Sequence, residues 1–151
     1  MSDPRVAHCI FCDDIRLEQG NKISLMGCYG ADISIDRPFP LTLPKFGFAV
    51  WLISDADDLP ERMSVSVILP DGSELLKSTP AELLPPAEKL EGVKKVKFNA
   101  AFPVAPLPLP SDGYLEVWVE TERERLRAGR LLVRSSAVGA LTFPTPVPPR
   151  S

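Results

Sequence analysis

Three cysteines and a histidine are the residue types in this sequence best suited to metal or redox chemistry. Cys9 and Cys12 are separated by two residues, His8 directly precedes them, and Cys28 follows later in the chain. Thiolate and imidazole groups are zinc ligands, and a Cys-x-x-Cys pair is typical of thiol redox proteins. The sequence therefore offers two chemistries: a zinc site built from these four residues, or a redox-active cysteine pair.

The strand predicted for these residues argues against both chemistries. Apolar residues alternate with period two here, which puts Cys9 and Cys12 on opposite faces, and likewise His8 and Cys9. A low-pKa redox cysteine instead sits at a helix N-terminus. We therefore predict buried, inert thiols and no cofactor, with a metal- or redox-responsive module as the alternative. Cys12 and Cys28 could still face each other across a hairpin and bond under oxidation.

Clustered carboxylates are a second possible source of chemistry. Asp55, Asp57, Asp58 and Glu61 fall in one loop, and calcium is bound by about six to eight oxygens in a shaped cage. The loop lacks the spaced Asp and Gly pattern of a helical calcium loop, so we predict an ordinary solvated hairpin loop.

No arrangement typical of catalysis is visible in the sequence. His8 is the only histidine, and there is no Gly-x-Ser-x-Gly turn or Gly-rich phosphate loop. Asp13 and Asp14 are adjacent in a strand and so point apart, which is poor geometry for shared acid–base work. We predict a non-catalytic protein. A hydrolase would require Asp13, Asp14, Arg16 and the 55–61 loop to meet in one pocket.

The most distinctive stretch is Phe11-Cys12-Asp13-Asp14-Ile15-Arg16, followed by Gly20-Asn21 and Met26-Gly27-x-Tyr29. It resembles the N-terminal hairpin of an uncharacterised family of small bacterial proteins known as a domain of unknown function. The resemblance implies membership of that family. It assigns no role to Cys12, Asp13, Asp14 or Arg16.

Length and composition indicate the kind of protein domain that contains these residues. The chain has 151 residues, 44% of them hydrophobic, with a net charge of -3, which favours one folded domain over disorder. The slight acidic excess argues against the basic surface that nucleic-acid binding usually requires. No apolar run is long enough to span a membrane. The sequence shows no signal peptide, and its three cysteines do not suggest a disulfide framework, so we predict a cytoplasmic protein.

Strand patterns dominate the whole chain. Apolar positions alternate between breaks that carry Pro, Gly, Asn or Asp, and about eight strands result, at 6–16, 22–35, 45–54, 63–69, 74–77, 95–102, 114–121 and 126–134. The 17 prolines gather in connections and in the C-terminal tail. We predict an all-β, antiparallel two-sheet sandwich, immunoglobulin-like, over residues 1–136, with a proline-rich tail at 137–151 and at most one short helical turn within 79–92. A partly open barrel is the alternative.

The first two strands should form a hairpin with Asn21 in the left-handed conformation. Its register would place Phe11, Ile15 and Leu17 opposite Tyr29, Leu25 and Ile23, and we assign that shared face to the core.

One sheet face has the composition of a protein interface. If Leu115, Val117 and Val119 face the core, Tyr114 and Trp118 face outward. They lie near Arg130 and neighbouring arginines, and these are residue types that anchor interfaces. We predict that Tyr114, Trp118 and Arg130 contact an unknown protein partner or a second copy of the chain. Nearby glutamates suggest cross-strand ion pairs, and an inverted register with Trp118 in the core is the alternative.

Overall fold

The computed structural model describes residues 3–83 and 91–135, which form twelve strands and no helix. In chain order the strands are β1 Val6–Glu18, β2 Lys22–Cys28, β3 Asp32–Ile35, β4 Leu41–Leu43, β5 Gly47–Asp55, β6 Arg62–Ile68, β7 Glu74–Lys77, β8 Ala81–Glu82, β9 Lys95–Pro103, β10 Leu107–Leu109, β11 Gly113–Glu120 and β12 Arg125–Ser135. Nothing among these residues is a helix long and apolar enough to cross a membrane.

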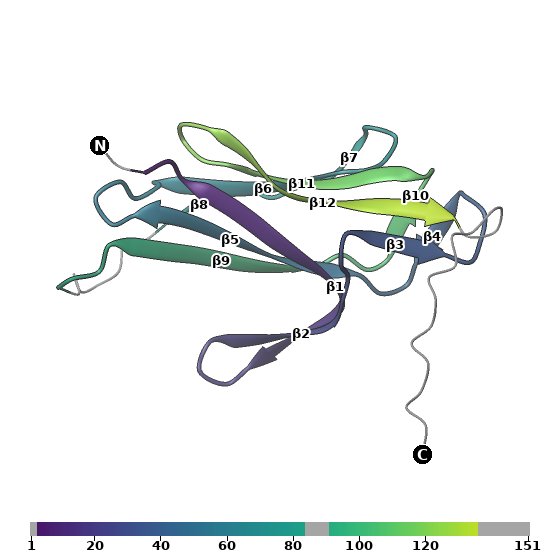
Figure 1. Cartoon of the computed structure of the whole chain (residues 1–151), viewed down its shortest axis with the longest axis horizontal. Helices are drawn as coiled ribbons and strands as arrows, with labels where there is room; N and C mark the ends of the chain where they lie inside the picture. Colours follow the sequence, from purple (N-terminus) through teal and green to yellow (C-terminus); the bar gives the residue numbers. More distant parts are fainter. Residues whose placement is uncertain (1–2, 84–90, 136–151) are drawn as a thin grey trace, which may run out of the picture.

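Two sheets pack face to face as the two layers of the fold (Figure 1). Sheet A has the strand order β2-β1-β5-β9, and sheet B has the order β3-β12-β11-β6-β7, with β8 paired to β6. A separate two-stranded ladder joins β4 and β10. Apart from the parallel β12–β3 pair, the ladders of the described chain are antiparallel. The predicted all-β, two-layer, antiparallel class is confirmed, and the immunoglobulin-like topology stays a prediction.

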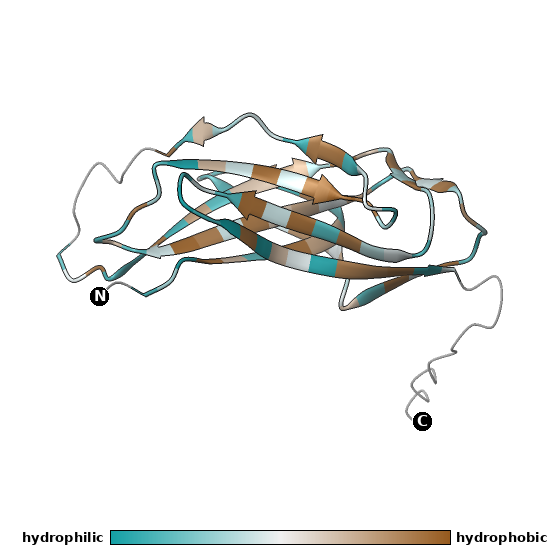
Figure 2. Cartoon of the chain, turned by 90° about the horizontal axis from the view of Figure 1, so that it is seen from above, coloured by the Kyte–Doolittle hydropathy of each residue, from teal (hydrophilic) through white to brown (hydrophobic). Residues whose placement is uncertain are grey.

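The core lies between the inner faces of the two sheets. Hydrophobic and hydrophilic residues alternate along the strands (Figure 2), because successive side chains of a strand point to opposite faces. Strand β5 lies between β1 and β9, as its apolar sequence predicted, although the outer side chains Trp51 and Ile53 are only half-buried. The largest fully buried side chains come from both sheets and from the β4/β10 ladder: Phe48, Leu52, Leu107, Leu109, Leu115 and Leu131.

Two proline-rich segments contain strands that the sequence did not predict. We expected extended connections at 37–44 and 103–110, because proline cannot donate to a ladder. Leu41–Leu43 and Leu107–Leu109 nevertheless pair, with Pro108 opposite Thr42. Both strands of a two-stranded ladder are edge strands. Proline is tolerated there because its missing N–H can face away from the partner strand. Short strands of this kind raise the count from about eight to twelve.

The strand predicted at 22–35 is divided between the two sheets. Strand β2 pairs with β1 in sheet A, whereas β3 pairs in parallel with β12 in sheet B. Strand β2 ends at Cys28, one residue after Gly27, which has a φ of 68°, a left-handed conformation that regular strands do not adopt.

Strand β1 passes close to β12 although the two strands belong to different sheets. A β-bulge shifts the β11–β12 register between Val117 and Trp118, and Gly129 lies at that irregularity. A Cβ atom at Gly129 would lie 2.6 Å from the sulfur of Cys9, so the approach depends on the missing side chain.

Two predicted segments fall partly or wholly outside the described residues. Of the possible helical turn within 79–92, the described part includes strand β8, and residues 84–90 are not described. The proline-rich tail at 137–151 also lies outside the described residues.

Candidate functional site

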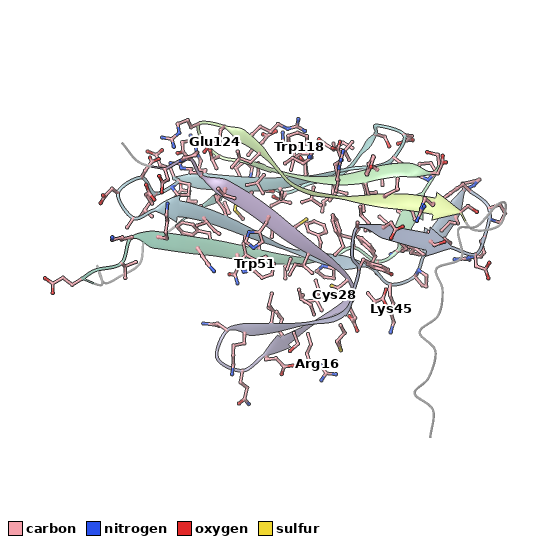
Figure 3. The ribbon with its side chains drawn as sticks, viewed as in Figure 1. Arg16, Cys28, Lys45, Trp51, Trp118 and Glu124 are labelled. Atoms are coloured by element: carbon pink, nitrogen blue, oxygen red, sulfur yellow. The ribbon has the colours of Figure 1, made fainter. Side chains whose placement is uncertain are left out.

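The outer face of strand β11 carries the two aromatic residues that the sequence placed there. Leu115, Val117 and Val119 are completely buried, and Tyr114 on the opposite face is 42% exposed. Trp118 is half-buried and lies on the side of sheet B away from sheet A (Figure 3). The alternative register, with Trp118 in the core, is therefore wrong.

Arginines from the neighbouring strand β12 cover both aromatic rings. The Arg125 guanidinium lies 4.1 Å from the centre of the Trp118 ring, and that of Arg127 lies 6.0 Å from it. The guanidinium of Arg130 lies 4.3 Å from the centre of the Tyr114 ring. These are cation–π distances, and they arise because β11 and β12 are paired and present these side chains on the same face.

Ion pairs distinguish Arg130 from the other arginines of this face. Arg127 pairs with Glu116 at 3.2 Å and Arg125 with Glu120 at 3.4 Å, which confirms the predicted cross-strand ladder. Arg134 pairs with Asp32 at the far end of β12. Within the described residues, Arg130 has no acidic partner at ion-pair distance, and it borders a shallow hollow lined by Ala31, Asp32, Tyr114, Leu132 and Arg134. We call Tyr114, Trp118, Arg125, Arg127 and Arg130 the arginine–aromatic face.

The family-like Cys-Asp-Asp-Ile-Arg stretch begins the β1–β2 hairpin, which extends away from the two layers (Figure 1). The Tyr29 hydroxyl donates a hydrogen bond to the Asp13 carboxylate. A Cβ at Gly27 would collide with that carboxylate, so glycine suits this position for space as well as for its φ. The Asp14 carboxylate accepts a hydrogen bond from the backbone N–H of Ile15, with 2.9 Å between nitrogen and oxygen. The Arg16 side chain is exposed.

The predicted hairpin register is correct, but only part of its apolar face is core. Asn21 has a φ of 57°, and Ile15 faces Leu25 as expected. Phe11 is buried, whereas Leu17 is 78% exposed. The reason is that β1 continues beyond the last residue it pairs with β5, so no second layer covers the hairpin tip.

The cysteines and the histidine are not brought into one site. Cys9 faces the core, and burial raises the pKa of its thiol to about 12. His8 points outward and stacks on Trp51, with ring centres 5.3 Å apart. Cys12 is buried and directly opposite the exposed Cys28. Across the described ranges, no group of three or more His, Cys, Asp or Glu side chains could hold a metal.

The acidic loop is paired with basic residues instead of being freely solvated. Asp55 accepts hydrogen bonds from Lys95 and from the N–H of Asp3. Asp58 accepts two bonds from the Arg123 guanidinium, at 2.6 and 3.1 Å. These interactions, with the Lys95 and Arg123 hydrogen bonds the largest, lower the pKa values of Asp55 and Asp58. The prediction of a simply solvated loop was therefore incomplete.

The acidic loop and the Cys-Asp-Asp stretch lie far apart. Cys12 pairs with Gly47 at the start of β5, and Asp55 ends the same strand. Eight residue steps of about 3.3 Å separate these ends by roughly 26 Å. The structure therefore does not gather Asp13, Asp14, Arg16 and the 55–61 loop into the pocket that a hydrolase would need.

Arg5 is a structurally important residue that the sequence analysis missed. It is 5% exposed, and its guanidinium pairs with Glu122 at 2.7 Å, Glu124 at 3.2 Å and Asp58 at 3.4 Å. Glu122 also accepts the backbone N–H of Glu61 at 3.0 Å. This Arg5 cluster joins the N-terminal segment to the 55–61 loop and to the β11–β12 hairpin. The only feature of the sequence that pointed to a basic partner was the excess of acidic residues in both of those loops.

Because of Glu122, the free energy of unfolding should change with pH in the acidic range. Burial alone would raise its pKa, but the hydrogen bonds from Arg5 and backbone N–H groups outweigh burial and lower that pKa from 4.5 to about 2. The folded state therefore holds this proton less tightly than the unfolded chain. The stabilisation is complete above pH 4.5 and is lost as the pH falls towards 2. Urea unfolding at several pH values should show this slope, and Glu122→Gln should flatten it. An unchanged slope would contradict the assignment.

Comparison with known proteins finds a family that matches most of the chain. A family described as a family of unknown function (DUF6941) matches residues 8–134. The match therefore extends over both sheets and well beyond the hairpin. No curated protein matches the chain. With most of its length matched, the chain belongs to DUF6941, a family of unknown function.

Proposed function

We propose that this protein acts by binding another protein through its arginine–aromatic face and catalyses no reaction of its own. The observation that carries the proposal is Arg130, whose guanidinium lies over the exposed Tyr114 ring without an acidic partner among the described residues. Each other arginine on the outer face of β12 has such a partner. Tyrosine, tryptophan and arginine are the residue types that most often dominate binding energy.

The geometry suggests the chemistry of the partner. The guanidinium group is planar, and its N–H groups match the two oxygens of a carboxylate. The hollow beside Arg130 and Leu132 has room for a side chain that inserts from outside. We therefore propose a partner that places an Asp or Glu side chain on Arg130, with Tyr114 and Trp118 supplying apolar contact area. A second copy of the chain is one candidate for this partner.

Site-specific photo-crosslinking tests the proposal. A photoreactive phenylalanine analogue at position 114, in cells that make the protein, should give a defined crosslinked product that mass spectrometry identifies. The same analogue at position 51 is the control, since Trp51 is a half-buried aromatic residue on the outer face of the other sheet. Arg130→Gln should reduce the position-114 product by about tenfold, the effect of losing roughly 1.4 kcal/mol of binding energy.

Light scattering of the purified protein separates the two kinds of partner. If the partner is a second copy, the mass should correspond to a dimer that Arg130→Gln converts to a monomer. Crosslinking from position 51 alone, or crosslinking from position 114 that Arg130→Gln leaves unchanged, would disprove the proposal.

A further inference from the structure

We propose that Cys12 and Cys28 form a dithiol site that a disulfide oxidant, such as oxidised glutathione, converts to a cross-strand disulfide at the base of the β1–β2 hairpin. The two residues are direct partners in the β1–β2 register. The neighbouring bond from the Tyr29 N–H to the Phe11 carbonyl measures 2.8 Å, so the cysteine pair lies between ladder hydrogen bonds. Facing Cα atoms at such a position are about 4.5 Å apart, within the range of about 4.4–6.8 Å that a disulfide spans.

The two thiols lie on the same face of the hairpin but point to different carbonyls. The Cys12 sulfur is 3.6 Å from the Gly47 oxygen, and the Cys28 sulfur is 4.0 Å from the Leu25 oxygen. Cys28 is exposed, so its side chain can turn towards Cys12 without displacing core atoms. The backbone register already suits the bond, and only side-chain rotation is required.

The remaining cysteine, Cys9, points away from this pair. Cys9 faces the core on the opposite side of β1 and packs against Gly129. Its burial also raises its thiol pKa to about 12, which leaves little thiolate to react. The chain therefore contains its own unreactive thiol as an internal reference.

The exchange needs one oxidant and balances in two steps. The Cys28 thiolate attacks a sulfur of oxidised glutathione, which forms a mixed disulfide and releases one glutathione thiolate. Cys12 then loses its proton to water and attacks the Cys28 sulfur, which forms the Cys12–Cys28 bond and releases the second glutathione. Two electrons pass from the protein thiols to the oxidant. Burial, with smaller effects from Cys28 and Asp13, raises the pKa of Cys12, so the second step should accelerate with rising pH.

The bond would fix the point at which the hairpin leaves the sandwich. Within the ladders of the described chain, β2 pairs only with β1. A two-stranded ribbon of this kind is marginally stable alone, and a covalent link at its base would hold β2 in register. The order of the exposed hairpin thus depends on the redox state of the surroundings. This dependence does not involve the arginine–aromatic face.

Thiol counting in glutathione buffers tests the site. The folded protein is equilibrated with excess oxidised glutathione, quenched in acid, denatured and alkylated. The expected product has lost two hydrogen atoms, retains one alkylatable thiol at Cys9, and yields a Cys12–Cys28 linked peptide. Cys9→Ser should retain the linked product, whereas Cys28→Ser, a change at an exposed position, should abolish it.

Several outcomes would overturn the proposal. These are three alkylatable thiols after equilibration, a Cys28–glutathione mixed disulfide that persists at pH 8.5–9, a link that involves Cys9, or a linked product in the Cys28→Ser variant. Cys28→Ser and Cys9→Ser decide the result without a substitution at the buried Cys12.

Discussion

Replacement of Arg5 by methionine is expected to lower the free energy of unfolding by about 3–5 kcal/mol at neutral pH, the usual cost of removing one partner from a buried ionic cluster. The Arg5 side chain is 2% exposed, and its three acidic partners are 18–24% exposed. Without the guanidinium, Glu122, Glu124 and Asp58 would face one another with partly desolvated negative charges. Denaturant unfolding followed by tryptophan fluorescence measures the loss.

Arg123 provides the matched control for Arg5. Its guanidinium also pairs with Asp58, at 2.6 Å, but its side chain is 54% exposed. An exposed ion pair contributes little to stability because solvent screens it, so Arg123→Met should cost far less than Arg5→Met. If both replacements cost the same, the burial of Arg5 does not matter. If Arg5→Met costs less than about 1 kcal/mol, the cluster does not hold the N-terminal segment in place.

Gly129→Ala is expected to destabilise the protein by about 1–3 kcal/mol, the typical cost of inserting a methyl group into a packed interior. The new Cβ would lie 2.6 Å from the Cys9 sulfur and 3.6 Å from the Phe11 ring. Gly129 does not have a left-handed φ, so the cost is steric. Because Cys9 is itself held by the core, its sulfur cannot simply move aside.

A double-mutant cycle with Cys9→Ala identifies the clash. Cys9→Ala alone removes one buried sulfur and should be modestly destabilising. Combined with Gly129→Ala, it leaves room for the new methyl group, so the double variant should be more stable than the sum of the single effects by at least about 1 kcal/mol. Additive effects would show that the two strands do not depend on this contact. Gly72→Ala is a control for an added Cβ in open space, although its φ of 88° adds backbone strain.

The strands of the main sheets were predictable because one physical rule governs them. Side chains of a strand alternate between faces, so an apolar residue at every second position marks a buried face. The Tyr114 and Trp118 face followed from the same rule, since Leu115 and Val117 occupy the intervening positions. The hairpin register followed from Asn21, one of the few residue types that tolerate a left-handed turn.

Other features depend on partners that are distant in sequence. The parallel β3–β12 pair joins Asp32 to Leu132, and nothing local marks either strand as the other's neighbour. Arg5 was missed because an isolated arginine near the N-terminus normally extends into solvent. The exposed end of the hairpin was missed because alternation shows which residues share a face, but not whether a second layer covers that face.

The β3–β12 pair also constrains how the chain can fold during synthesis. The paired residues Asp32 and Leu132 are 100 positions apart in sequence, and β12 lies between β3 and β11 in the finished sheet. Sheet B therefore cannot be completed until β12 has emerged from the ribosome. Until then, β3 and the edge of β11 that β12 will occupy present unpaired backbone N–H and C=O groups to solvent. During this interval the nascent chain is most exposed to aggregation and most in need of a chaperone.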